Sequence, residues 1–180
     1  NVLQRTREII KLLEQEERPI FIFVNSTDMI YSLMKNLELT EQSAVFCSEK
    51  SVDKLKGLKF SKAFEHWDEK QMKRYNWMTS RFYSALDIEL SVPPIVLMIT
   101  DCFMAEYTMF DPYMDAVQIV GRFRNGVSSV YHISNYDKRI FPVTEDDLIV
   151  NFRCAENVYK YLGVMADSVT TEPEKKAFLE

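Results

Sequence analysis

Along the first 40 residues, apolar positions follow a helical spacing, then form a continuous run, and then return to a helical spacing. Residues 2–16 place apolar side chains among charged ones at intervals typical of an amphipathic helix. Pro19 ends this helix, because the residue before a proline avoids helical angles. Residues 20–24 are all apolar, as in a strand that is buried on both faces. Residues 27–37 are predicted to form a second helix.

The alternation between strand-like and helix-like segments continues along the chain. Further strands are predicted at residues 44–47, 75–78, 94–99 and 127–134. Further helices are predicted within residues 48–59 and at residues 61–74, 111–123 and 145–162. Residues 170–180 are polar, and we expect them to be loose.

Strands that alternate with helices predict a parallel sheet covered by helices on both faces. The pattern therefore fits a small doubly wound α/β domain. In such sheets, ligands bind beyond the carboxyl ends of the strands. Four predicted strands are followed by polar or small residues that should line this edge: Asn25-Ser26, Cys47-Ser48, Thr79-Ser80 and Thr100-Asp101.

Charge and cysteine content narrow the functional classes. The 180 residues include 22 Lys and Arg against 27 Asp and Glu, a formal net charge of -5. This balance argues against a surface that coats nucleic acid by charge alone, but leaves a narrow track of phosphate contacts open. No apolar run reaches the roughly 18–20 residues that span a bilayer, so we expect no membrane partner. Three dispersed cysteines and only two histidines predict reduced thiols, a cytoplasmic location and no metal site.

The most specific stretch runs from Gln118 to Gly126, at the end of a predicted helix and on the turn after it. Arg122 and Arg124 stand two residues apart in this stretch. Their planar, permanently charged guanidinium groups suit bidentate contact with phosphate oxygens. An exposed loop with two solvated arginines explains the same pattern, so composition alone leaves both interpretations open.

A second stretch, residues 79–88, directly follows a predicted strand. The hydroxyl of Thr79 can hold a phosphate there, and the carboxylate of Asp87, eight residues later, can hold a ribose hydroxyl. Taken alone, the stretch is better explained as an ordinary connection between a strand and a turn.

Three segments together resemble motifs four, five and six of superfamily-two helicases, in the order found in that family. They are the apolar strand with Asn25-Ser26, the stretch from Thr79 to Asp87, and the stretch from Gln118 to Arg124. The resemblance covers about residues 20–134 and implies the second RecA-like domain of such a protein. That domain is an α/β fold of three layers, with a mainly parallel sheet of five or six strands. Ala85 stands where the fifth motif usually has glycine, and the two arginines are more closely spaced than usual.

The resemblance also implies a role for each matching residue. Arg122 and Arg124 would be catalytic finger arginines that reach a nucleotide held mainly by another domain. Positions of the fifth and sixth motifs would contribute to the nucleotide site: Gln118, Gly121, Ala85 and Asp87. Hydroxyl groups at neighbouring strand ends would bind the nucleic-acid backbone: Ser26, Ser48 and Thr79.

The sequence contains no phosphate-binding loop of the Gly-x-x-x-x-Gly-Lys-Ser/Thr type. ATP and Mg²⁺ would therefore be held mainly by an upstream RecA-like domain, and we expect the isolated chain not to hydrolyse ATP. The chain begins with Asn1 and shows no signal peptide, which we interpret as a piece of a longer protein. The expected organisation is a RecA-like domain over residues 1–143, followed by a helical extension and tail over residues 144–180. Asp101 is interpreted as a strand-end residue rather than a magnesium ligand.

These observations predict the carboxy-terminal motor domain of an ATP-dependent helicase or translocase that acts on DNA or RNA, with a single strand favoured. Two alternatives stay open. The first is a RecA-like fold kept as a binding or scaffold module without catalysis, which the net acidity and Ala85 favour. The second is a small nucleotide-binding enzyme that acts alone, which the missing phosphate loop disfavours.

Overall fold

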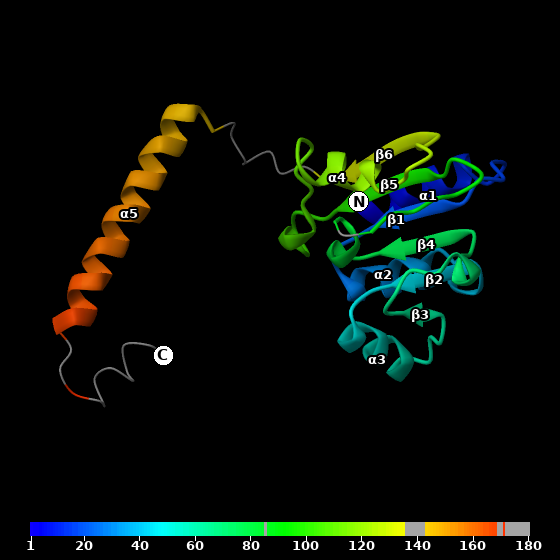
Figure 1. Ribbon diagram of the computed structural model, residues 1–180, viewed down its shortest axis with the longest axis horizontal. Helices are drawn as coiled ribbons and strands as arrows, with labels where there is room; N and C mark the ends of the chain where they lie inside the picture. Colours follow the sequence, from blue (N-terminus) through cyan, green and yellow to red (C-terminus); the bar gives the residue numbers. More distant parts are fainter. Residues whose placement is uncertain (85, 136–142, 169–170, 172–180) are drawn as a thin grey trace. The chain divides into compact units, whose positions relative to one another are not determined.

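The computed structural model describes residues 1–84, 86–135, 143–168 and 171, and the chain divides into two compact units, Asn1–Asp137 and Lys138–Glu180. The described residues of the first unit form six strands and four α-helices (Figure 1). The strands are β1 (Ile20–Phe23), β2 (Ser43–Phe46), β3 (Ala63–Phe64), β4 (Tyr75–Met78), β5 (Ile95–Thr100) and β6 (Ser129–Ser134). The helices are α1 (Val2–Leu12), α2 (Thr27–Asn36), α3 (Glu49–Gly57) and α4 (Asp115–Gly121). Short 3-10 helices lie at η1 (Thr40–Gln42), η2 (Glu69–Gln71), η3 (Ser80–Phe82) and η4 (Glu106–Thr108).

The six strands form one sheet in the order β3-β2-β4-β1-β5-β6, and every neighbouring pair is parallel. Strand β1 lies inside the sheet, where Ile20 is opposite Tyr75 of β4 on one side and Ile95 of β5 on the other. All four residues of β1 are fully buried, which explains why this segment is apolar without interruption. The predicted α/β class with a parallel sheet is confirmed.

The prediction of a helix over residues 61–74 is wrong. This segment instead forms the edge strand β3, a bend and the 3-10 helix η2. The backbone of Val45 donates to the carbonyl of Lys62, and that of Cys47 to the carbonyl of Phe64, so the segment continues the sheet. Phe60 and Ala63 are buried there. Short apolar stretches of this kind fit a strand and a helix equally well by spacing alone, and pairing with β2 decides between them.

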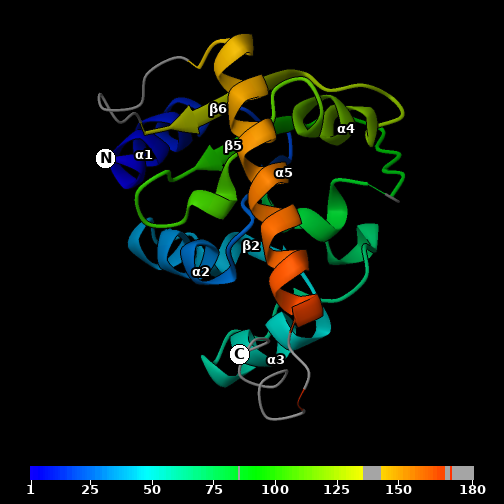
Figure 2. The same ribbon diagram turned by 90° about the vertical axis from the view of Figure 1, so that its left-hand side faces the viewer.

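Helices α1, α2 and α3 cover one face of the sheet. Along β1, Ile20 and Ile22 point into this first core, together with Trp77 of β4. The indole of Trp77 is fully buried and donates a hydrogen bond to the hydroxyl of Ser43, 3.0 Å away. Figure 2 shows α1 and α2 on one side of the strands and α4 on the other, so the domain has three layers.

The opposite face carries a second core that is rich in aromatic rings. Phe21 of β1 lies 4.9 Å from Phe123 and 5.4 Å from Trp67 between ring centroids, and Phe23 lies 5.9 Å from Tyr83. Edge-to-face packing of this kind adds to the stabilisation from burial alone. Helix α4 is short, so the connection between β4 and β5 supplies much of the cover, including Phe82, Ile88 and Leu90.

Two predicted helices are shorter in the structure, and in one of them a side chain holds a local turn in place of the first helical residues. The segment predicted as a helix over residues 111–123 is helical only from Asp115 to Gly121. The carboxylate of Asp111 accepts hydrogen bonds from the backbone of Tyr113 (2.7 Å) and Met114 (3.0 Å), and so holds a turn in place of the first helical residues. Helix α1 ends at Leu12 rather than at residue 16.

The second unit contains the helix α5 (Glu145–Ser168), six residues longer than predicted. Thr144 and Asp147 cap its start, with the backbone of Asp147 donating to the hydroxyl of Thr144 (3.2 Å). The carboxylate of Asp147 accepts from the hydroxyl (2.6 Å) and the backbone (3.1 Å) of Thr144, and these hydrogen bonds hold its pKa below the usual value. Residues 170–180 were predicted to be loose, and all of them except 171 lie outside the described residues. The domain boundary between residues 143 and 144 stays a prediction. Among the described helices, none combines the length and the apolar character needed to cross a lipid bilayer.

We predict that Phe21→Ala lowers the free energy of unfolding by about 3–5 kcal/mol, because it empties the centre of the aromatic core. Urea denaturation followed by tryptophan fluorescence measures the change. The matched control is Phe103→Ala, which removes a ring that is 56% exposed and should change stability by no more than about 0.5 kcal/mol. Equal effects of the two substitutions would contradict the packing described here.

Candidate functional site

The carboxyl ends of all six strands lie along one edge of the sheet, because every pair of strands is parallel. At the ends of β1, β2 and β4 this edge is hollowed into a cavity of about 190 Å³, which we call the hydroxyl pocket. Its lining consists mainly of hydroxyl side chains and contains one cation: Asn25, Ser26, Thr27, Ser48, Ser51, Thr79, Ser80 and Arg81.

Strand register explains why these segments meet. Met78 of β4 is opposite Phe23 of β1 and also opposite Phe46 of β2, so the residues that follow the three strands emerge side by side. The side chain of Asn25 joins the segment after β1 to the segment after β4, because its carboxamide oxygen accepts a hydrogen bond from the backbone of Ser80 (3.4 Å).

Two helices begin at the hydroxyl pocket. Ser26 is the N-cap of α2, and its hydroxyl accepts from the backbone of Met29 (3.3 Å). Ser48 is the N-cap of α3, but its hydroxyl donates to Ser51 (3.2 Å) rather than capping the helix. Helix N-termini carry a partial positive charge and unpaired backbone N–H groups that favour anions, and here Asp28 and Glu49 already place a carboxylate in the first turn of α2 and of α3.

Arg81 supplies the full positive charge at this pocket. Its guanidinium lies 3.0 Å from the carboxylate of Glu65, and both side chains are more than one-third exposed. An ion pair that exposed is worth no more than about 1 kcal/mol, so an incoming anion can compete for the arginine. Donor hydroxyls, helix N-termini and an arginine are groups that can hold a phosphate.

Cys47 lies immediately beside this pocket at the end of β2 and is fully buried. Burial raises the pKa of its thiol to about 11, against the opposing influence of Arg81. The thiolate that nucleophilic or redox chemistry requires is therefore scarce at neutral pH. The pocket is equipped to bind, and Cys47 serves as a small apolar residue of the core.

The pocket brings together three residues that the sequence assigned to nucleic-acid contact: Ser26, Ser48 and Thr79. Sequence reasoning missed Ser51 and Arg81 as members of the same site. Ser51 lies in the first turn of α3. Its spacing of three residues from the N-cap Ser48 is the feature of the sequence that could have pointed to it. Arg81 follows Thr79 closely in the sequence, but nothing in the spacing of this short 3-10 helix indicates which way an arginine on it points.

Arg124 and Asp87 form a second cluster, away from the lining of the hydroxyl pocket. The guanidinium of Arg124 lies 2.6 Å from the carboxylate of Asp87, and the two side chains are 49% and 55% exposed. A backbone bridge joins the same segments, because Ile88 donates to the carbonyl of Arg122 (2.8 Å) and Arg124 donates to the carbonyl of Ile88 (3.0 Å). The stretches around Asp87 and the arginines, 37 residues apart in the sequence, therefore form one surface element.

Arg122 stands beside this pair on the other side of the buried Phe123. Its guanidinium donates to the carbonyls of Gln118 (3.1 Å) and Leu86 (3.4 Å). Gln118 contributes a backbone carbonyl here, and its side chain is exposed. Gly121 has open space where a side chain would start, so packing does not require a glycine there. Ala85 lies outside the described residues.

Asp101 at the end of β5 forms a turn. One oxygen of its carboxylate accepts from the backbone of Phe103 and of Met104 (both 3.1 Å) and from the side chain of Asn135 (2.6 Å). Burial by itself would raise the pKa of Asp101, but these hydrogen bonds hold the pKa below its ordinary value. Across residues 1–84, 86–135, 143–168 and 171, no three His, Cys, Asp or Glu side chains are grouped to hold a metal ion.

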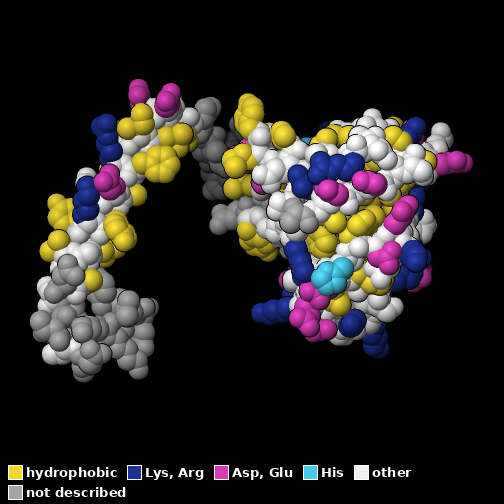
Figure 3. All heavy atoms as spheres, viewed as in Figure 1, with side chains coloured by type: hydrophobic (Ala, Val, Ile, Leu, Met, Phe, Trp, Pro, Cys, Tyr) yellow, Lys and Arg dark blue, Asp and Glu magenta, His cyan; other side chains and the backbone are white. Residues whose placement is uncertain are grey.

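Acidic and basic side chains are interspersed on the face of the first unit shown in Figure 3. That face therefore carries no broad basic field, in keeping with the net charge of -5. No model of a known protein family matches the sequence, and no curated protein matches it either. The chemistry of the two clusters must accordingly be argued from their own geometry.

We predict that the stability contributed by Asp101 disappears in acid. Its pKa is lower in the folded chain than the roughly 3.9 of an unfolded one, so it stabilises the fold above that pH and ceases to do so as pH falls through the lower, folded value. Urea unfolding between neutral pH and about pH 3 should show a smaller acid loss for Asp101→Asn than for the unchanged chain. Parallel curves for the two proteins would contradict this account.

Proposed function

We propose that this chain is the second motor domain of an ATP-dependent helicase or translocase, which grips the phosphate backbone of a single strand of DNA or RNA. The observation that carries the proposal is the hydroxyl pocket. The three segments that follow β1, β2 and β4 place Ser26, Ser48 and Thr79 around one cavity of about 190 Å³. These are the positions to which the helicase resemblance assigns backbone contact.

The chemistry of the pocket suits one or two phosphates of a strand rather than a broad polyanion. Hydroxyl and backbone N–H donors satisfy phosphate oxygens without adding net charge. Arg81 contributes one cation, and the N-termini of α2 and α3 contribute partial positive charge. An acidic protein can bind a nucleic-acid strand in this way, through a few hydrogen-bond donors that are directed at its phosphates.

The cluster of Asp87, Arg122 and Arg124 supports the proposed contact with a nucleotide. Arg122 and Arg124 are held beside Asp87 on a surface element that is anchored by Phe123 and Ile88. Phosphoryl transfer depends on positioning and charge neutralisation, and an arginine supplied by a second module can raise the rate by about 10³–10⁵. In the parent protein, ATP and Mg²⁺ would lie on another RecA-like domain, with Arg122 and Arg124 at the γ-phosphate, Asp87 at the ribose, and Gln118, Gly121 and Ala85 around the site.

One observation favours a second candidate, a binding module without catalysis. Both guanidinium groups already have partners within the domain, Arg124 the carboxylate of Asp87 and Arg122 two backbone carbonyls. A domain that never delivers its arginines to a nucleotide would keep these contacts. The turnover measurement below separates the two candidates.

For strand binding, we predict that Ser48→Ala and Thr79→Ala each weaken the affinity of the chain for a fluorescein-labelled single strand by about tenfold, because each removes a donor to a charged phosphate. Fluorescence anisotropy at several salt concentrations measures this loss. Ser128→Ala is the matched control, since it removes an exposed hydroxyl just before β6, outside the pocket. Unchanged affinity in both pocket variants would overturn the assignment of the pocket.

For turnover, we predict that Arg122→Ala and Arg124→Ala in the parent protein lower the rate of strand-stimulated ATP hydrolysis by about 10³ or more while ATP still binds. Arg5→Ala, on the exposed side of α1, is the control and should leave turnover unchanged. Loss of an exposed ion pair costs no more than about 1 kcal/mol, so the Arg124 variant should stay folded. Full turnover in both variants would exclude the motor assignment, and an unchanged parent without any turnover would favour the binding module.

A further inference from the structure

Glu65 lies beside the hydroxyl pocket without lining it. It directly follows β3, whose Phe64 is opposite Phe46 of β2. The backbone of Cys47 donates to the carbonyl of Phe64 (3.0 Å), so the residues after β2 and β3 emerge next to each other at the carboxyl edge of the sheet. A carboxylate is thereby placed at the border of a site that is proposed to hold a phosphate.

An ion pair with Arg81 holds the carboxylate of Glu65. The Nη1 atom of Arg81 donates a hydrogen bond to Oε1 of Glu65 at 3.0 Å. The other carboxylate oxygen, Oε2, lies 3.9 Å from Nε2 of His66, which is too far for a hydrogen bond. Among the described residues, Arg81 is therefore the one hydrogen-bond partner of this carboxylate.

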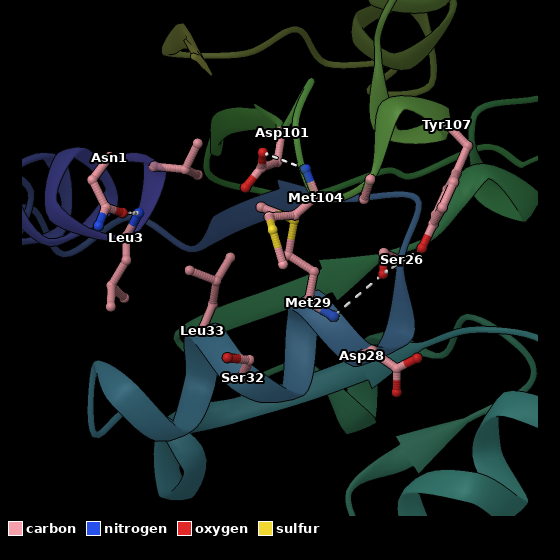
Figure 4. A pocket seen from close by; sticks show the side chains of 12 residues that line it. Asn1, Leu3, Ser26, Asp28, Met29, Ser32, Leu33, Asp101, Met104 and Tyr107 are labelled. Carbon is pink, nitrogen blue, oxygen red and sulfur yellow. Dashed lines mark hydrogen bonds between the residues drawn. The ribbon is translucent and has the colours of Figure 1, made fainter.

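Arg81 supplies the positive charge that a phosphate meets at this edge. Burial raises the pKa of the Cys47 thiol at the end of β2, and the charge of Arg81 opposes that rise, so its influence reaches the floor of the pocket. A larger cavity of about 450 Å³ shares Ser26 with the hydroxyl pocket (Figure 4). It adds the carboxylates of Asp28 and Asp101. Among the described residues that line the two cavities, Arg81 is the only Lys or Arg.

The carboxylate of Glu65 neutralises the arginine of the pocket through a contact that is weak enough to exchange. The side chains of Arg81 and Glu65 are 41% and 37% exposed, so water and salt reach the ion pair and screen it. A phosphate in the hydroxyl pocket offers charged oxygens to the same guanidinium, and arginine binds phosphate and carboxylate with the same geometry. A phosphate and Glu65 therefore compete for Arg81.

We propose that Glu65 is an autoinhibitory residue of the hydroxyl pocket, whose carboxylate occupies Arg81 until a phosphate of the bound strand displaces it. This inference rests on the proposed function, because the phosphate belongs to the strand that the hydroxyl pocket is proposed to grip. Each binding event breaks the ion pair, so the intact chain holds the strand less tightly than the pocket would without Glu65. A motor that moves along a strand must also release it, and the returning carboxylate favours release.

The test measures the affinity of the 180-residue chain for a fluorescein-labelled oligo-dT of about ten nucleotides, by fluorescence anisotropy at neutral pH and low salt. We expect Glu65→Gln to bind about three- to fivefold more tightly, the factor that an exposed ion pair can contribute. The matched control is Glu41→Gln, which removes the same charge from the exposed pair with Lys62 (2.9 Å). That pair lies before β2 and β3, at the opposite edge of the sheet, and its loss should leave the affinity unchanged.

Arg81→Ala provides the decisive background. If Glu65 acts by occupying the arginine, Glu65→Gln should raise the affinity of the unchanged chain but have no effect in a chain that already carries Arg81→Ala. If the carboxylate merely repels the strand, the gain should persist in that background. A loss of folding lowers affinity, so it cannot produce the tighter binding expected for Glu65→Gln.

The failure of this inference and the failure of the proposed function give different results. If Glu65→Gln binds no more tightly than the unchanged chain, or if its gain persists beside Arg81→Ala, the autoinhibitory contact is wrong. The proposed strand grip then still stands, provided that Ser48→Ala and Thr79→Ala weaken binding. If neither the unchanged chain nor Glu65→Gln binds the strand, the autoinhibitory contact and the strand grip fail together.

Discussion

Parallel pairing on both sides of β1 is the constraint from which the rest of this domain follows. Because each strand runs in the same direction as its neighbours, every strand-to-helix connection leaves from one edge. Ser26, Ser48 and Thr79, which are separated by 22 and 31 positions in the sequence, thus become neighbours. The same pairing buries both faces of β1 and divides the core into an aliphatic half under α1, α2 and α3 and an aromatic half under α4.

Each half of the core positions one of the two clusters. On the aliphatic side, α2 and α3 begin where β1 and β2 end, so their N-termini point at the hydroxyl pocket. On the aromatic side, the connection after β4 crosses the sheet and carries Asp87 to the end of α4, where Arg124 stands. Contact with a strand and contact with a nucleotide are therefore proposed for two points on one connection, Thr79 at its start and Asp87 near its middle.

Much of the fold could be predicted because the buried strands are unbroken apolar runs, and the runs from Ile20 to Val24 and from Ile95 to Ile99 are too short for a typical helix. Strand β3 could not be predicted, because a strand of two residues is too short to show an alternation of apolar and polar positions, and only its pairing with β2 reveals it. The start of α4 was misplaced because an aspartate followed by proline also begins a turn, and Asp111 does so here. Of the candidate sites, Ser26, Ser48 and Thr79 were visible as strand ends, whereas the place of Ser51 and Arg81 in the same lining depends on a cavity that only folding creates.

The backbone bridge between Ile88 and Phe123 has a mechanical consequence. Phe123 is wedged against Phe21 in the middle of the sheet, and the residues on either side of it are the two arginines. The backbone of both arginines is hydrogen-bonded to Ile88 and so held against the core. The reach of each guanidinium group toward a ligand is therefore set by rotation of its own side chain.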